Sequence, residues 1–211
     1  VRRDNYHPDF DALEAAVTGK PNAIMLNSPN NPTGAVYTPE EIKQLLDFAK
    51  KHDLWILDDM IYATLAWTDY PYTSPSSLPG GAERTITIGG WSKGWAMTGW
   101  RLGWITGPKR VMDGVKKINV SAATHVATFM MPAATVALGL HEETAMMAAS
   151  FKERRGIIHE LLTELPGVVV PEPEGAFYAL CDIRGTGMSD IEFATRALEE
   201  ASVQLIPGSL M

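Results

Sequence analysis

The chain has little cysteine, no excess of positive charge and no long apolar run, and each shortage excludes a class of protein. Its 211 residues contain one cysteine, Cys181, so no internal disulfide can form and a reducing, cytoplasmic environment is expected. The formal net charge is −7, whereas nucleic-acid-binding domains are usually basic, so we expect no nucleic acid among its partners. Proline and glycine interrupt the most apolar stretch, residues 127–140, which predicts no association with a membrane.

Metal-binding spacing is also missing from the sequence. The 5 histidines and the single cysteine are scattered, and no second histidine follows His141 at the spacing of a zinc-binding helix. We therefore predict no metal site. The apolar fraction of 45% and the charged fraction of 20% are typical of a globular protein with an ordinary core.

Apolar runs alternate with amphipathic stretches in the first part of the chain. The runs that predict strands are residues 23–26, 54–57, 85–88 and 101–106. The first of them is continuously apolar, as in a strand that is buried on both faces. Helical spacing of apolar residues predicts helices over residues 9–18 and 38–52, and Thr38 has the sequence context of an N-cap in a capping box. This alternation indicates an α/β fold with a mostly parallel sheet.

The last third of the chain has a different pattern. It contains, in order, a long helical pattern, two short strand-like runs and an amphipathic helix, at residues 142–165, 168–170, 175–180 and 189–201. We therefore expect residues 1–141 to form part of a large three-layer α/β/α domain. Residues 142–211 are expected to form a linking helix and part of a small α+β C-terminal domain.

Polar signals follow three of the predicted strands. They are the loop of residues 27–34, the pair Asp58 and Asp59, and Lys93. Each has an ordinary structural alternative, because the loop can be a turn, either aspartate a helix N-cap, and Lys93 or Arg101 a surface charge. In open α/β sheets, however, ligands bind at the carboxyl ends of the strands. The combination therefore favours a shared binding site.

Pyridoxal phosphate would use all of these groups. Its aldehyde requires a lysine amine, its pyridine nitrogen an anionic partner, and its phosphate cationic or amide donors. A carboxylate beside the nitrogen keeps the ring protonated, so that the ring accepts electrons when a bond at a substrate Cα breaks. Lys93 is then the catalytic residue, which forms a Schiff base and afterwards moves the proton.

The sequence resembles the class I/II aminotransferases of the aspartate aminotransferase fold type over essentially its whole length. Three motifs carry the resemblance: residues 30–34 (Asn-Asn-Pro-Thr-Gly), residues 59–62 (Asp-Met-Ile-Tyr), and Ser92-Lys93 followed by residues 97–103 (Met-Thr-Gly-Trp-Arg-Leu-Gly). The resemblance implies the fold of the pyridoxal-phosphate-dependent transferases of fold type I. It also implies that the cofactor is pyridoxal 5′-phosphate and that the protein is a homodimer.

The resemblance assigns a role to five residues. Lys93 matches the Schiff-base lysine, and Asp59 matches the aspartate that pairs with the pyridinium. Tyr62 and Asn31 match the residues that hydrogen-bond the ring hydroxyl. Arg101 matches the arginine that binds the phosphate as a fork. The spacing of three between the acidic residue and the tyrosine selects Asp59 rather than Asp58.

The sequence departs from the family pattern at Gly90, Met60 and Met131, where members often have a phosphate-binding serine, a glutamate and a glutamine. Residues 175–178 (Gly-Ala-Phe-Tyr) resemble the family's segment near the substrate. The chain begins without methionine and ends in a turn signal, so we expect an internal fragment that lacks other cofactor and substrate contacts of the family and is a poor catalyst alone.

The resemblance implies an aminotransferase that moves an amino group between an L-amino acid and a 2-oxo acid. Two alternatives stay open. The first is another fold-type-I enzyme with the same cofactor, namely a C–S lyase, a decarboxylase or a synthase. The second is an aminotransferase-like effector-sensing domain of a transcription regulator. The sequence does not specify the amino acid.

Overall fold

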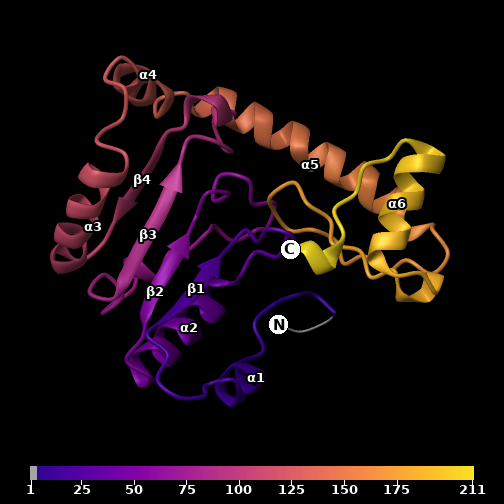
Figure 1. Ribbon diagram of the computed structural model, residues 1–211, viewed down its shortest axis with the longest axis horizontal. Helices are drawn as coiled ribbons and strands as arrows, with labels where there is room; N and C mark the ends of the chain where they lie inside the picture. Colours follow the sequence, from indigo (N-terminus) through magenta and orange to yellow (C-terminus); the bar gives the residue numbers. More distant parts are fainter. Residues whose placement is uncertain (1–3) are drawn as a thin grey trace.

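A four-stranded sheet organises the first half of the computed structural model, which describes residues 4–211 (Figure 1). The strands lie in the order β1–β2–β3–β4, with the bounds β1 Ala23–Asn27, β2 Trp55–Asp59, β3 Thr85–Gly90 and β4 Gly103–Thr106. The pairs β1–β2 and β2–β3 are parallel, and β4 runs antiparallel to β3. The predicted α/β fold with a mostly parallel sheet is therefore confirmed.

Two helices pack on one face of this sheet. Helix α2, Pro39–Lys51, begins with the predicted capping box, in which Thr38 accepts a hydrogen bond from the Glu41 amide and Glu41 accepts one from the Thr38 amide. Helix α1, Phe10–Ala15, packs against the same core. The main buried residues of this core come from β1, α2, β2 and the residue before β2, and they are Leu26, Ile42, Leu45, Leu46, Phe48, Ala49, Leu54 and Ile56.

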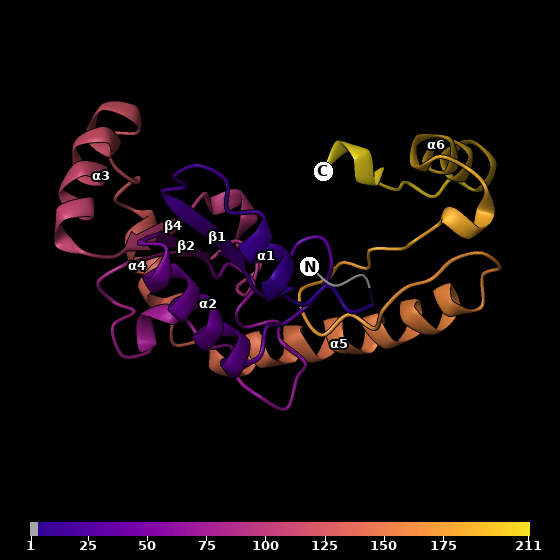
Figure 2. The ribbon, with the colours of Figure 1, turned by 90° about the horizontal axis from the view of Figure 1, so that it is seen from below.

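The other face of the sheet is less well covered. Met25 is 69% exposed, and Ile88 and Ile105 are exposed as well. The prediction that residues 23–26 are buried on both faces is therefore wrong, because α1 and α2 both pack on the Leu26 side of β1. Helix α3, Lys109–Ala122, follows β4 and buries none of its residues, and Figure 2 shows it projecting from the β4 side of the sheet.

The rest of the chain extends away from the sheet (Figures 1 and 2). Helix α4, Met130–Ala137, precedes the long helix α5, His141–Thr163, and α6, Asp190–Ala201, lies near the C-terminus. Short 3-10 turns complete the described elements at Pro75–Ser77, Thr98–Trp100, Arg184–Thr186 and Gly208–Leu210. None of the helices within residues 4–211 combines the length and the apolar character needed to cross a lipid bilayer.

The two strands predicted at residues 168–170 and 175–180 are not formed. The structure has only isolated bridges there, Val169 with Asp182 and Ala66 with Gly175. Instead of pairing with residues 168–170, the second segment hydrogen-bonds to the sheet-bearing part of the chain, where the Ala176 amide donates to the Leu65 carbonyl at 2.7 Å. Long-range backbone contacts therefore replace the two short strands that the apolar runs predicted.

Candidate active site

The carboxyl ends of the parallel strands bring the predicted loops together. Asn27 of β1 and Asp59 of β2 are register partners, and the Asn27 side-chain amide donates to the Asp59 carbonyl at 3.1 Å. The Asn27 side-chain oxygen in turn accepts from the Asn31 backbone amide at 2.7 Å. Asn27 thus fixes the start of the Asn-Pro-Thr-Gly loop against β2, a contact that the sequence motif did not reveal.

The two neighbouring aspartates have different surroundings, because successive residues of a strand point to opposite faces of the sheet. Asp58 is fully buried and accepts hydrogen bonds from the Tyr72 hydroxyl at 2.6 Å and the Ser74 hydroxyl at 2.5 Å. Burial raises the pKa of the Asp58 carboxyl, against the lowering effect of these two hydrogen bonds.

Asp59 lies on the opposite face and is half-buried. Its side-chain oxygen accepts from the Ile61 amide at 3.2 Å, which fixes the carboxylate in the turn after β2. No helix begins at this point, so the alternative that one of the aspartates is a helix N-cap is wrong.

Tyr62 occupies the centre of the site. Its hydroxyl lies 2.5 Å from the hydroxyl of Tyr178, and it also interacts with the Asn31 side chain. Burial, the hydrogen bond with Tyr178 and the charge of Asp59 hold the pKa of Tyr62 well above its usual value, and the hydrogen bond with Asn31 opposes this shift. The phenol is therefore protonated at neutral pH and can act as a hydrogen-bond donor. Asn31, Asp59 and Tyr62 are thus brought together, as the resemblance implies.

Lys93 joins this group from the turn after β3. Its Nζ lies 5.8 Å from the centroid of the Tyr62 ring and 5.6 Å from that of Phe177, so aromatic rings border the amine. The turn fits closely against the one that carries Tyr62, since a Cβ atom added at Gly94 would lie 2.1 Å from the Thr64 hydroxyl oxygen. An amine, a carboxylate and a phenol therefore converge at one end of the sheet.

Arg101 is placed differently from the other four predicted residues. Its side chain is exposed and donates to the Thr98 carbonyl at 2.9 Å. Its backbone adopts the left-handed conformation, with φ of 53°, which non-glycine residues rarely adopt. Within residues 4–211, no hydrogen bond or ion pair joins Arg101 to the other predicted site residues.

Phe177 and Tyr178 are site residues that sequence reasoning identified only as part of a segment that resembles the family. Phe177 lies edge-on to Tyr62, with ring centroids 5.5 Å apart, and stacks on Phe151 of α5 at 5.1 Å. The only local signal was the aromatic pair after Gly175. Their contact with Tyr62 spans more than a hundred residues of sequence and could not be read from spacing.

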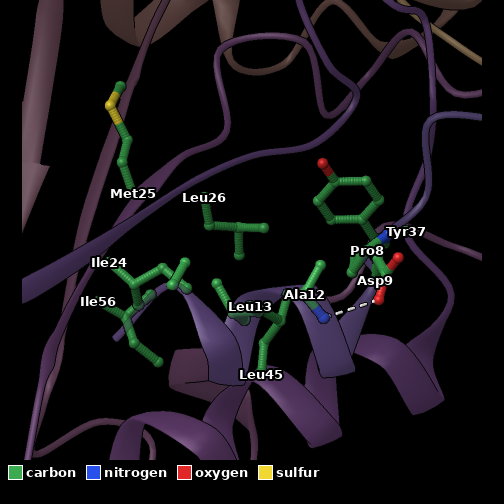
Figure 3. Close-up of a pocket in the computed structure, with 11 residues that line it drawn as sticks. Pro8, Asp9, Ala12, Leu13, Ile24, Met25, Leu26, Tyr37, Leu45 and Ile56 are labelled. Atoms are coloured by element: carbon green, nitrogen blue, oxygen red, sulfur yellow. Dashed lines mark hydrogen bonds between the residues drawn. The ribbon is translucent and has the colours of Figure 1, made fainter. Parts of the chain in front are cut away.

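A separate apolar cavity of about 310 Å³ lies between α1 and the edge strand β1 (Figure 3). It is formed mainly by aliphatic side chains, and its lining residues are Pro8, Asp9, Ala12, Leu13, Ala16, Ile24, Met25, Leu26, Tyr37, Leu45 and Ile56. It contains none of the predicted site residues. Its one carboxylate, Asp9, caps α1 by accepting from the Ala12 amide at 2.9 Å. The predicted site residues therefore lie at the ends of the strands and not in this cavity.

Residues 4–211 contain no group of three or more histidine, cysteine, aspartate or glutamate side chains placed to hold a metal ion. The amine, carboxylate and phenol that converge here match the aldehyde, the ring nitrogen and the ring hydroxyl of pyridoxal phosphate, respectively. The residues present therefore fit that cofactor.

Solved structures share this fold. An aromatic aminotransferase from Pyrococcus horikoshii OT3 superimposes with a TM-score of 0.94 at 37% identity, over 98% of this chain and 56% of that one. An aspartate aminotransferase from Thermotoga maritima superimposes with a TM-score of 0.87 at 38% identity, over 97% of this chain and 53% of that one. The fold is that of the fold-type-I aminotransferases.

Sequence comparison gives the family. The family model described as aminotransferase class I and II matches residues 1–211, and the chain belongs to this family. It is 43% identical to a putative aminotransferase, YugH, of Bacillus subtilis, over 94% of this chain and 51% of that protein. It is 40% identical to aromatic-amino-acid aminotransferase 2 of Thermococcus litoralis, over 98% of this chain and 54% of that protein. The chain thus spans about half the length of the relatives it matches. The predicted family is confirmed, and its members depend on pyridoxal phosphate.

Proposed function

We propose that the protein is a pyridoxal-phosphate-dependent aminotransferase that moves an amino group between an L-amino acid and a 2-oxo acid. The observation that carries this proposal is the convergence of Lys93, Asp59 and Tyr62 at the carboxyl ends of β2 and β3. When bound, the cofactor supplies a ring that accepts the electrons of a substrate Cα bond.

Each converging group has a distinct task. Lys93 would hold the cofactor through its amine, and once the substrate amine had displaced it, the freed Lys93 amine would hold and move the proton at the substrate Cα. Asp59, held by the Ile61 amide, pairs with the protonated ring nitrogen. The protonated phenol of Tyr62 and the side-chain amide of Asn31 donate hydrogen bonds to the ring hydroxyl.

Arg101 would bind the cofactor phosphate. A guanidinium offers several donors in a planar fork and therefore matches phosphate geometry better than an ammonium does. The exposed position of its side chain is compatible with a group that closes onto the phosphate only when the cofactor enters.

The narrower properties of the protein are part of the same proposal. We place a large cofactor-binding domain at residues 1–141 and a linking helix with part of a small domain at residues 142–211. Partly exposed apolar side chains on α4 and α5, such as Val136 and Met146, support an assembled protein, and we propose a cytoplasmic homodimer. Relatives named for aspartate and for aromatic amino acids make these two the first substrates to test.

Borohydride trapping tests the proposal directly. The complete protein, incubated with pyridoxal phosphate, should absorb in the visible range, and reduction followed by peptide mapping should place the adduct on Lys93. Lys93→Ala should abolish the adduct and transamination. Lys109→Ala, which removes an exposed lysine paired with Asp113, should leave both unchanged. An adduct on another lysine, or a trapped Lys93 without transamination of any amino acid, would contradict the proposal.

A further inference from the structure

His7 connects three segments that lie far apart in the sequence. Its Nδ1 lies 2.8 Å from the carboxylate of Glu41, in the first turn of α2, and its Nε2 lies 2.8 Å from the carboxylate of Glu174. The imidazole is buried, with a side-chain exposure of 8%. None of the roles proposed above uses this cluster. A buried histidine with a carboxylate on each ring nitrogen calls for an explanation.

Glu174 links this cluster to the site. The same carboxylate oxygen that contacts His7 accepts from the Val36 amide at 2.9 Å. The backbone amides of Glu174 and Gly175 both donate to the Gly34 carbonyl, at 2.9 and 2.8 Å. The fit is tight, since a Cβ atom at Gly175 would lie 2.7 Å from Pro29 and from Val36. Glu174 is therefore seated on the loop that carries Asn31.

The residues that follow Glu174 reach the proposed catalytic groups. Phe177 lies 5.6 Å from the Lys93 amine, and the Tyr178 hydroxyl lies 2.5 Å from that of Tyr62. Only three residues separate Glu174 from Tyr178, so we expect a displacement of Glu174 to move these aromatic rings. A shift at His7 is therefore transmitted to the site.

The ionisable groups near His7 determine whether it can keep its contacts with both Glu41 and Glu174. Among residues 4–211, Glu41, Glu174 and Tyr37 contact His7, and Tyr70 interacts electrostatically with the two carboxylates. Tyr37 has a ring centroid 5.9 Å from the imidazole, and its pKa is raised, chiefly by burial. Burial, followed by the charges of Glu174, Glu41 and Asp69, raises the pKa of Tyr70 to about 12. Both phenols are therefore neutral near pH 7.

The two carboxylates accordingly favour the imidazolium. The hydrogen bond with Glu174 is the main cause that raises the pKa of His7, and burial opposes it. Burial acts to raise the pKa of Glu174, but the hydrogen bonds from His7 and Val36 outweigh it, and the net shift is downward. A protonated imidazole donates to both carboxylates at once, whereas a neutral one has a single N–H. Deprotonation would therefore release one of the two contacts.

The geometry points to His7 as a positioning residue, which through Glu174 holds residues 173–178 against the cofactor and substrate side of the site. This inference rests on the proposed function for its catalytic consequence. The contact by which His7 and Glu174 position residues 173–178 involves only residues of this chain, so it can be measured without cofactor or substrate.

Hydrogen exchange of the backbone amides in residues 173–178 of the complete protein is the test. Because the amides of Gly175 and Ala176 donate to Gly34 and Leu65, they report directly on the seating of the segment. His7→Gln should accelerate their exchange about tenfold, which corresponds to about 1.4 kcal/mol, and amides of β2 should not change. In the parent protein, protection corrected for the intrinsic rate should fall as the pH rises through the elevated pKa of His7. In His7→Gln the protection of these amides should be low at every pH.

Two further variants keep the test decisive. Glu174→Gln retains an acceptor for the Val36 amide, and it should reproduce the loss of protection and of its pH dependence. His52→Gln is the matched control, because His52 also contacts a glutamate, Glu14, at 3.0 Å, but at the far end of α2. It should leave residues 173–178 unchanged. In steady-state assays, His7→Gln should raise the amino-acid KM severalfold with kcat within about twofold.

Three results would overturn the inference: unchanged exchange in His7→Gln, an equal effect of His52→Gln, or faster exchange spread uniformly over the sheet. The outcome is separable from that of the proposed function. A selective loss of protection in His7→Gln, together with no borohydride adduct on Lys93 in the parent protein, would support the positioning contact and refute the proposed aminotransferase.

Discussion

Replacing Asp58 by alanine should destabilise the fold, whereas replacing its neighbour Asp59 should weaken cofactor binding and leave stability nearly unchanged. The two residues share a residue type and adjacent positions in β2, but they point to opposite faces of the sheet. Asp58 is fully buried and accepts two hydroxyl hydrogen bonds, from Tyr72 and Ser74. These hydrogen bonds fasten the loop after β2 to the strand.

The magnitude follows from what Asp58→Ala leaves behind. Each hydrogen bond to a charged group contributes about 1.5–3 kcal/mol, so the pair contributes about 3–6 kcal/mol. Burial of the carboxylate offsets part of this, as its raised pKa indicates. We therefore expect a loss of about 2–4 kcal/mol in the free energy of unfolding, because Tyr72 and Ser74 lose their acceptor.

Asp58→Asn refines the test, since the amide keeps an acceptor without the charge. Its loss should be smaller than that of Asp58→Ala. The sign of the pH dependence is fixed by the raised pKa: protonation of Asp58 favours the folded state, so the parent protein should gain stability relative to Asp58→Asn as the pH falls toward about 3.9. Any opposite trend would contradict the assigned burial effect.

Urea unfolding of the complete protein without cofactor measures stability, and titration with pyridoxal phosphate measures binding. Asp59→Ala should unfold within about 1 kcal/mol of the parent, because it loses the hydrogen bond from the Ile61 amide but no core packing, and it should lose most of its cofactor affinity. A destabilised Asp59→Ala with normal affinity, or a stable Asp58→Ala, would refute the division of roles.

Three further predictions concern single side chains. Thr38→Ala removes the capping box of α2 and should lower the free energy of unfolding by about 1 kcal/mol in urea unfolding. Tyr178→Phe removes a hydrogen bond that raises the pKa of Tyr62, so the phenolate of Tyr62 should form at lower pH in an ultraviolet absorbance titration than in the parent protein. Arg101→Gly relieves a left-handed backbone and should add up to about 1 kcal/mol of stability, while pyridoxal phosphate binds more weakly in an absorbance titration.

The sequence predicted the elements that are specified by neighbouring residues. The Thr38 capping box and the apolar stripe of α2 involve contacts within one helix, and the apolar runs of β2 and β3 have the length and side-chain types of strands. The strands expected at residues 168–170 and 175–180 failed for the opposite reason. Their apolar side chains allow strand pairing, but whether strands form depends on competing backbone partners elsewhere, which for residues 174–176 are the carbonyls of Gly34 and Leu65.

In the candidate site, too, local sequence identified some residues and only the tertiary structure revealed others. The aspartate pair and Lys93 could be singled out because they follow short apolar runs, whereas the choice of Asp59 and the role of Tyr62 came from the family resemblance. The partners Tyr178 and His7 could not, since their contacts join residues separated by more than a hundred positions and depend on how the chain after α5 returns to the sheet. Sequence spacing defines a motif, and tertiary packing decides which distant side chain completes it.

A final prediction concerns Gly34, on which residues 173–178 pack after the chain returns from α5 to the sheet. This packing leaves no room for a side chain at Gly34. A Cβ atom at Gly34 would lie 2.6 Å from Pro173, and the residue has φ of +75°. Gly19 is a matched control, with φ of +73° and nothing within 4 Å of an added Cβ. Both alanine variants carry a left-handed strain of about 1–2 kcal/mol, but only Gly34→Ala adds overpacking of about 1–3 kcal/mol. We therefore expect Gly34→Ala to unfold at a lower urea concentration than Gly19→Ala and to expose the amides of residues 173–178 to hydrogen exchange. Equal effects of the two variants would show that this segment does not pack on Gly34.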